Sequence, residues 1–229
     1  MAGRVYTDRR LVGGADVDPE GWAHLDALAR WQQDVAFADG IDAGLGGESG
    51  WVIRRNSLAV RRMPRFMERL ELRTWCAGLA ASTAERRTTI EGDAGAAIEA
   101  TAIWVHVDVA TRRPARFPPH FLAAYEESAA GRRPSTKLHH PKPDPSTPRE
   151  GWTFSPADVD VAGHVNNAVY WRVLEAALGD SVPRGDALLE AEYRAGTDAG
   201  EAQVARNGGM LWVLTDGGEV AASLSAEPA

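Results

Sequence analysis

The sequence predicts an α+β protein built from two tandem repeats, each a long helix wrapped by an antiparallel β-sheet. The first observation is an internal repeat: Ala-Asp-Val-Asp occurs at residues 15–18 and again at 157–160, 142 positions later. In both copies a glycine follows three positions after the second aspartate. The second observation is that a helical pattern and then a run of alternating segments follow each copy. These features indicate a duplicated unit.

Each repeat opens with a predicted amphipathic helix that buries one face. In the first repeat the face comprises Leu25, Leu28, Ala29, Trp31, Gln32 and Val35. In the second repeat it comprises Ala168, Trp171, Val173, Leu174 and Leu178.

Alternating apolar and polar residues after each helix predict four strands per repeat. The first set covers 52–60, 70–76, 85–90 and 98–108, and the second covers 188–194, 202–207, 210–215 and 220–224. Gly92-Asp93-Ala94-Gly95 and Asp216-Gly217-Gly218 have the composition of tight turns. The strands should therefore form antiparallel meanders.

Residues 131–148 are rich in proline, charge and small polar side chains, which is typical of an extended surface connection. We expect an N-terminal repeat at 1–125, a linker at 126–151 and a C-terminal repeat at 152–229. A single long helix wrapped by an antiparallel sheet is the hot-dog architecture, so the sequence predicts two tandem hot-dog repeats. Sandwich and barrel folds also have short strands, but they do not explain a long helix that opens each repeat.

Composition narrows the possible functions. The net charge is −7 without a basic stripe, which argues against a nucleic-acid partner. Cys76 is the only cysteine, so the chain has no disulfide framework and no cysteine-based zinc site. The first residues reach charge too early for a signal peptide, and no apolar run approaches the roughly 20 residues that span a bilayer. We expect a cytoplasmic protein that does not enter a membrane.

The segment from Asp158 to Tyr170 contains the densest group of candidate catalytic residues in the sequence. Asp160, His164 and Asn166 lie close to a predicted helix start, where free backbone N–H groups and the helix dipole can stabilise an oxyanion. Asp160 could attack a carbonyl or activate water, and Gly163 would let a substrate approach closely. Asp160 and Asn166 are also ordinary helix-capping residues, so capping alone is the alternative interpretation.

These residues resemble a known family. Asp-Val-Asp-Val-Ala-Gly-His-Val-Asn-Asn-Ala-Val-Tyr at 158–170 is similar to the signature of hot-dog thioesterases. The first half resembles the acyl-carrier-protein thioesterases of plants and bacteria in its motifs, which occur in the family's order at 51–55, Pro64, 72–75, 102–105 and 111–118. The resemblance covers nearly the whole chain.

The resemblance implies a catalytic aspartate at Asp160 and a catalytic histidine at His164. Two features depart from the plant pattern: Ala162 stands where plant enzymes have an asparagine, and Gly196 and Thr197 stand where they have an acidic residue and a cysteine. Asn166 could replace part of the missing amide function. The departures put a larger catalytic network in doubt and favour a simpler site of one carboxylate and a helix N-terminus.

The two repeats should not be equally active. Asp18 matches Asp160, but Trp22 stands where His164 stands. We expect one active site in the second repeat and an acyl tunnel lined by the first. Candidates for the lining are Trp31, Val35, Phe37, Trp51 and Ile53, although apolar residues at such spacing are more often plain core.

Paired arginines could contact an acidic carrier protein or could simply form a solvated outer face. These pairs are Arg54-Arg55, Arg61-Arg62, Arg86-Arg87, Arg112-Arg113 and Arg132-Arg133. The pair His139-His140 in the linker has no partner at metal-ligand spacing in the sequence and is expected to be exposed.

The function expected is hydrolysis of fatty acyl-carrier-protein thioesters without a metal or cofactor, by a monomer or homodimer. An acyl-CoA thioesterase of the same fold would use the same residues. The alternatives are a hot-dog dehydratase, which the position of His164 before the second helix disfavours, and a non-catalytic protein that binds acyl thioesters.

Overall fold

A computed structural model describes residues 3–45 and 50–228. The predicted ends of the two repeats at residues 1 and 229 lie outside these ranges. The first half contains β1 (Tyr6–Leu11), α1 (Leu25–Asp42), β2 (Gly50–Arg62), β3 (Arg69–Ala80), β4 (Thr83–Gly92) and β5 (Ala97–Val107). The second half contains β6 (Arg149–Phe154), α3 (Val169–Leu178), β7 (Ala187–Tyr193), β8 (Gly200–Asn207), β9 (Met210–Thr215) and β10 (Val220–Pro228). Between the halves lies α2 (Pro119–Ala129).

The ten strands form one antiparallel sheet in the order β1-β3-β4-β5-β2-β7-β10-β9-β8-β6. From either edge inward, the order reads first, third, fourth, fifth and second strand of a half, so the two halves are arranged identically. They meet where β2 pairs with β7, for example at Leu58 opposite Leu189. This topology confirms the predicted duplication.

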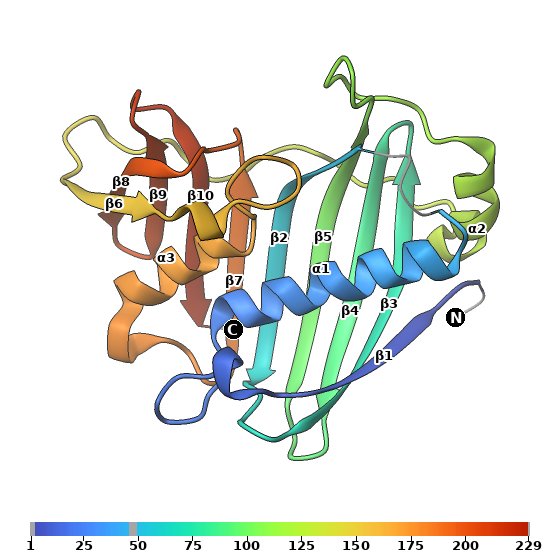
Figure 1. Cartoon of the computed structure of the whole chain (residues 1–229), viewed down its shortest axis with the longest axis horizontal. Helices are drawn as coiled ribbons and strands as arrows, with labels where there is room; N and C mark the ends of the chain where they lie inside the picture. The colour runs from blue at the N-terminus through green and yellow to red at the C-terminus, as the bar shows by residue number, and fades with distance from the viewer. Residues whose placement is uncertain (1–2, 46–49, 229) are drawn as a thin grey trace.

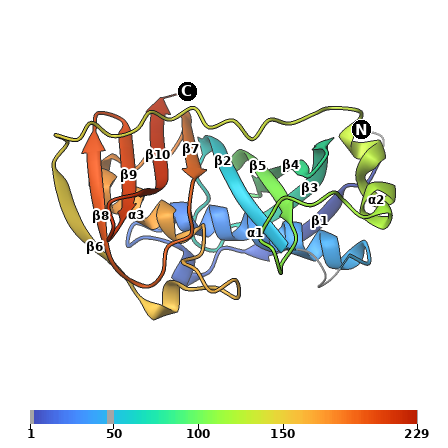
Figure 2. The same ribbon diagram turned by 90° about the horizontal axis from the view of Figure 1, so that it is seen from above.

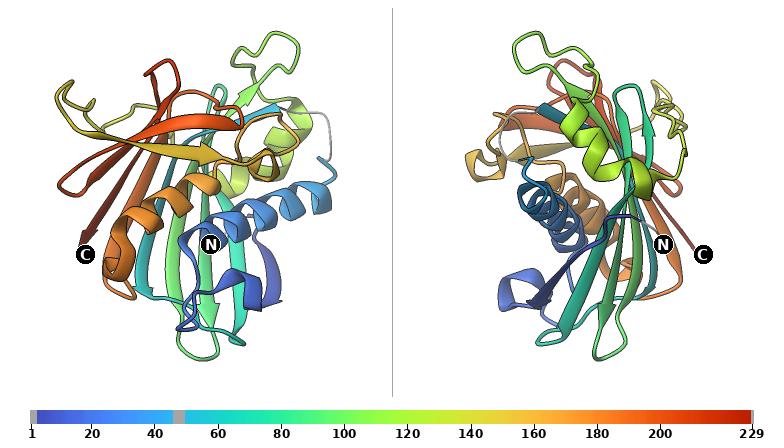
Figure 3. Two further views of the ribbon diagram at one scale, coloured as in Figure 1. Left: turned by 60° about the vertical axis from the view of Figure 1, so that its left-hand side comes forward. Right: turned by 90° about the vertical axis from the view of Figure 1, so that its right-hand side faces the viewer.

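The sheet curls around the two long helices. In Figures 1 and 3, α1 crosses the concave face of the first half and α3 lies against the second half. One hydrophobic core contains buried side chains from both helices and from strands of both halves, among them Leu28, Leu58, Trp171 and Leu224. The fold is therefore two hot-dog repeats closed into one body, as the sequence predicts.

The eight predicted strands and both predicted helices are present. Two strands and one α-helix of the described structure lie outside the predicted elements. Strands β1 and β6 lie at the two edges of the sheet, where charged and polar residues such as Arg9 and Glu150 mask the alternation. Helix α2 is short and begins at the second of two adjacent prolines, Pro118 and Pro119. The predicted boundaries at 125/126 and 151/152 fall inside α2 and β6.

Residues 131–148 connect α2 to β6 without a helix or strand. Figure 2 shows this linker running along the face of the sheet opposite α1 and α3. In the structure this connection is extended and mostly exposed. Within the described ranges, no helix combines the length and apolar composition needed to cross a membrane.

Candidate active site

The loops that precede α1 and α3 share one hydrogen-bond pattern. In the second repeat the N–H of Asp160 donates to the carbonyl of His164, that of Gly163 to Asp160, and that of Asn166 to Asp158. The same bonds recur 142 positions earlier, where Asp18 donates to Trp22, Gly21 to Asp18, and His24 to Asp16. Gly21 and Gly163 have φ values of +82° and +80°, which explains the glycine in both turns.

In the second repeat this loop holds the Asp160 carboxylate at two points. The backbone N–H of Ala162 donates to Oδ1 at 2.8 Å, and the side-chain amide of Asn166 donates to Oδ2 at 3.0 Å. Asp160 is half-buried, while Val161, Ala162 and Gly163 are exposed. The carboxylate is therefore held in position beside an exposed stretch of the loop.

Asn166 performs two tasks. Its Oδ1 accepts the N–H of Ala168 at 2.8 Å, and its carbonyl accepts the N–H of Val169, so it stabilises the turn that leads into α3, whose N-cap residue is Ala168. Its amide nitrogen binds Asp160 at the same time. The helix start is anchored from the sheet, because the hydroxyl of Tyr193 on β7 donates to the carbonyl of Asn167 at 2.9 Å. Asn166 thus couples the aspartate to the positive end of α3.

The His164 imidazole lies between a glycine and an acid. A Cβ on Gly196 would stand 2.9 Å from Cγ of His164, so the bare backbone of residue 196 packs against the ring. Nδ1 of His164 lies 3.4 Å from Oδ1 of Asp198. The side chain is 40% exposed, which leaves part of the ring accessible. Asp198 escaped the sequence prediction, although it lies in the same loop as the noted Gly196 and Thr197.

The matching loop of the first repeat is occupied by its own contacts. Asp18 accepts the N–H of Trp22 at 2.8 Å and forms an ion pair with Arg184. The Trp22 ring lies between the guanidinium groups of Arg65 and Arg184, 4.4 and 5.8 Å from its centroid. At the start of α1, the N–H of Leu25 donates to Oε2 of Glu175 at 2.6 Å. The carboxylate and the helix N-terminus are both neutralised there.

A cavity lies in the first half. It has a volume of about 610 Å³, between the end of α1, strands β2, β4 and β5, and α2. Of the predicted lining residues, Phe37 and Trp51 face it. Trp31, Val35 and Ile53 are instead fully buried in the main core, which is the alternative that the sequence left open. Neither Asp160 nor His164 lines this cavity.

The predicted surface role of the arginine pairs is wrong for Arg86. This side chain is 9% exposed, lines the cavity, and donates from Nη1 to Oδ2 of Asp39 at 2.5 Å. Burial lowers the pKa of Arg86, but Tyr125 and Asp39 outweigh that effect and raise it. Neighbouring Arg87 points to the other face of the strand and donates to Glu85. Arg61, Arg62, Arg112, Arg113, Arg132 and Arg133 are exposed.

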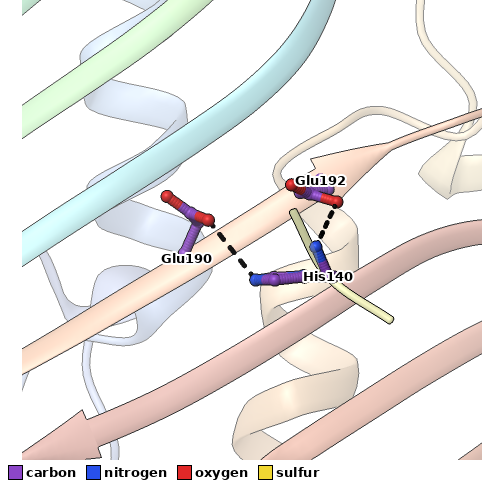
Figure 4. Close-up of side chains that lie close together, drawn as sticks. All are labelled: His140, Glu190 and Glu192. Atoms are coloured by element: carbon purple, nitrogen blue, oxygen red, sulfur yellow. Dashed lines mark hydrogen bonds and ion pairs between the residues drawn. The ribbon is translucent and has the colours of Figure 1, made fainter. Parts of the chain in front are cut away.

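The predicted exposure of the histidine pair is wrong for His140. Its side chain is 9% exposed and lies 3.4 Å from Glu190, and its backbone N–H donates to Glu192 (Figure 4). Burial raises the pKa of Glu190, but His140 and Arg55 outweigh it and lower the pKa. His140 is close to two carboxylates because the linker crosses β7, a contact that linear spacing cannot reveal.

Ligand atoms of His140, Glu190 and Glu192 lie within 4.8 Å of one another, a spacing that a metal ion could use. Glu192 is already bonded, however. Its carboxylate accepts the backbone N–H groups of His139 and His140 and pairs with Arg194. Because the oxygens of Glu192 already form these bonds, we interpret the cluster as a contact that holds the linker on the sheet.

Comparison with known proteins agrees with this geometry. The family model for the acyl-ACP thioesterase N-terminal domain matches residues 3–125, more than half of the chain. Two uncharacterized proteins of Mycobacterium tuberculosis are 26% identical over 87% of this chain and 81% of theirs. A chloroplastic acyl-[acyl-carrier-protein] hydrolase of Cuphea viscosissima is 28% identical over 73% of this chain, which spans 46% of the plant protein.

The fold also matches a solved structure over its full length. The 12:0-ACP thioesterase from Umbellularia californica superimposes with a TM-score of 0.77 at 20% identity, covering 100% of this chain and 99% of the other. The family model and the shared fold lead to one assignment. The chain belongs to the acyl-ACP thioesterase family and is a thiolester hydrolase with two tandem hot-dog repeats.

Proposed function

We propose that the protein hydrolyses fatty acyl-carrier-protein thioesters to the free acid and the carrier thiol, with Asp160 as general base or nucleophile. The observation that carries this proposal is the Asp160 carboxylate, held by the N–H of Ala162 and the amide of Asn166 beside the start of α3. A fixed carboxylate next to a helix N-terminus combines an attacking group with a region that favours negative charge.

The thioester carbonyl would lie between Asp160 and the first turn of α3. As general base, Asp160 would take a proton from water while the water oxygen attacks the carbonyl carbon. As nucleophile, it would attack directly and form an anhydride that water then cleaves. In either route the departing thiolate needs a proton, and His164, half exposed beside Asp198, is placed to orient the thioester or supply it.

Three observations favour a single site in the second repeat. Asp18, the counterpart of Asp160, is paired with Arg184, and the start of α1 is capped by Glu175. Trp22 replaces the histidine. At the matching loop of the first repeat, neither the Asp18 carboxylate nor the start of α1 is therefore free. The part of this repeat would be to receive the acyl chain in the cavity beside Phe37 and Trp51.

One relative supports acyl-carrier protein as the carrier. The Cuphea relative is an acyl-[acyl-carrier-protein] hydrolase. Exposed arginines such as Arg61, Arg62, Arg132 and Arg133 offer positive charge to an acidic carrier. Acyl-CoA presents the same pantetheine arm, so it is the second candidate substrate, and a protein that binds acyl thioesters without hydrolysis is the third candidate.

The test is thiol release from matched acyl-carrier-protein and acyl-CoA thioesters. Asp160→Asn should lower kcat/KM by at least about 100-fold, the usual contribution of a positioned general base. His164→Gln should lower it as well. The matched control is Asp18→Asn in the first repeat, which should lose stability and keep activity. Full activity in folded Asp160→Asn would reject Asp160, and binding without turnover on every thioester would reject hydrolysis.

A further inference from the structure

The cavity of the first half has aromatic walls and one cationic group. Its walls include Phe37, Trp51, Trp104, Phe121 and Tyr125. In Figures 1 and 3, α2 lies beside the end of α1, and this helix supplies Phe121 and Tyr125. A volume of about 610 Å³ is within the usual range for small-molecule pockets. The charged member of the lining is Arg86, which comes from β4.

Arg86 is only partly satisfied by the protein. Its Nη1 donates to Oδ2 of Asp39, and its Cζ lies 5.1 Å from the centroid of the Tyr125 ring. A guanidinium carries five N–H donors. In the described part of the chain, Asp39 is the one acceptor that forms a hydrogen bond of good geometry with Arg86. No nitrogen of Arg86 is both fully buried and unpaired, so the remaining N–H donors are accessible from the cavity that this side chain lines.

Asp39 cannot supply more to Arg86, because it is shared. Its Oδ1 accepts Nε of Arg4 at 2.6 Å, and its Oδ2 also accepts the hydroxyl of Tyr125 at 2.8 Å. One fully buried carboxylate thus serves two arginines and a phenol. Asp39 fixes the guanidinium against the cavity wall and leaves its remaining donors for a ligand.

A plain hydrocarbon chain would pack unfavourably against the guanidinium of Arg86 in this cavity. Packing methylenes against a buried guanidinium removes water from N–H donors and gives no acceptor in return, which is unfavourable. An oxygen atom at the same place would accept a charge-assisted hydrogen bond, while the carbon chain packs on the aromatic walls. Sites built to bond a substrate oxygen discriminate strongly against analogues that lack it.

We propose that this cavity selects acyl chains that carry an oxygen acceptor on the part remote from the thioester. The acceptor is a hydroxyl, keto or carboxylate group, and the guanidinium of Arg86 donates a hydrogen bond to it. The proposal rests on the proposed function, since it takes the cavity to be the acyl-chain site. It narrows the substrate from fatty acyl chains in general to oxygenated ones, and Arg86 becomes a specificity-determining residue.

The experiment compares matched pairs of acyl thioesters, alkyl against terminally hydroxylated and terminally carboxylated, across medium and long chain lengths. For the wild-type protein, kcat/KM at the best length should be about tenfold or more higher for an oxygenated member than for its alkyl partner, the ratio expected for one hydrogen bond to a charged group. Arg86→Met should abolish this preference by lowering turnover of the oxygenated substrates.

Arg87→Met is the matched control, because Arg87 is the next residue of β4 and donates to Glu85 on the other face. It should keep the preference of the wild-type protein. Equal kcat/KM for alkyl and oxygenated partners in the wild-type protein would overturn the proposal and indicate that water satisfies Arg86. An equal loss of preference in both variants would overturn it as well.

A binding measurement keeps the proposal testable if Arg86→Met does not fold or if no thioester turns over. Titration calorimetry of the wild-type protein with the free alkanoic, hydroxyalkanoic and dicarboxylic acids should show tighter binding of the oxygenated acids. Absence of turnover together with this preference would reject the proposed function and leave the cavity inference standing. Equal affinities would reject the cavity inference alone.

Discussion

The contact between Gly196 and His164 shows how a single missing side chain shapes the site. Gly196 stands where the plant pattern has an acidic residue, and its backbone packs against the imidazole. An acidic side chain at this position would displace the ring. Asp198, two residues later, places a carboxylate oxygen 3.4 Å from Nδ1 of the histidine. In this chain the carboxylate of the loop that faces the histidine therefore belongs to residue 198.

Gly196→Ala should therefore impair catalysis more than stability. The added Cβ would lie 2.9 Å from Cγ of His164, so the half-exposed ring must move. A displacement of about 1 Å in a catalytic group can reduce kcat/KM by on the order of 100-fold. The control is Gly151→Ala, where a Cβ meets no atom within 4 Å. Normal kinetics in Gly196→Ala would show that His164 has no catalytic role.

Tyr125 gives the protein a sensitivity to alkaline pH. Burial raises the pKa of its phenol to about 12, with Arg86 opposing the shift and Asp39 adding to it. An unfolded tyrosine titrates near 10. At a pH between the unfolded and the folded pKa of Tyr125, the folded state keeps a proton that the unfolded state loses. The free energy of unfolding therefore falls as pH rises through this range.

The expected loss from Tyr125 is about 2 to 3 kcal/mol across that pH range. It can be measured by urea denaturation at closely spaced pH values. Burial also raises the pKa of Tyr193, so that residue contributes in the same direction. Tyr125→Phe should make the alkaline decline shallower than in the wild-type protein. An identical pH dependence in the two proteins would contradict this assignment.

The elements themselves could largely be predicted from the sequence, because they depend on local spacing. Helical periodicity predicts α1 and α3, and alternation predicts eight strands. The cavity could not be predicted in this way. It forms where the end of α1, strand β4 and the unpredicted α2 meet, and Asp39, Arg86 and Tyr125 are far apart in the sequence. A pair of adjacent arginines gives no sign that one of them is buried.

The linker is the element whose position depends most on one side chain. Glu192 on β7 is fully buried and accepts the backbone N–H groups of His139 and His140 while pairing with Arg194. Glu192→Ala should cost about 3 kcal/mol, because it leaves the paired groups buried without an acceptor. Glu150→Ala, at an exposed position of β6, should cost much less.

Release of the linker can be separated from general destabilisation. In Glu192→Ala, trypsin should cut after Lys137 faster than in the wild-type protein, under conditions where the folded state still dominates. Unchanged cleavage together with lower stability would mean that Glu192 supports β7 and does not hold the linker.

At the scale of the whole molecule, the two repeats are joined along a continuous structure. Strands β2 and β7 pair across the seam, and one core contains side chains of both helices. Polar contacts also join the two halves: Arg172 of α3 forms an ion pair with Asp26 of α1 at 2.9 Å, and Glu175 of α3 caps the start of α1. A separated first half would expose the edge of β2 and half of this core, which promotes aggregation.

These contacts predict that the repeats unfold together. Leu189 lies in the second half, is fully buried and pairs with Leu58 across the seam. Leu189→Ala should destabilise the protein by roughly 2 to 5 kcal/mol, as other large-to-small core changes do. If unfolding is cooperative, hydrogen exchange of the most protected amides should accelerate by the same free energy in β4 of the first half and in β9 of the second. Acceleration confined to β9 would show that each repeat opens independently and that the seam does not couple them.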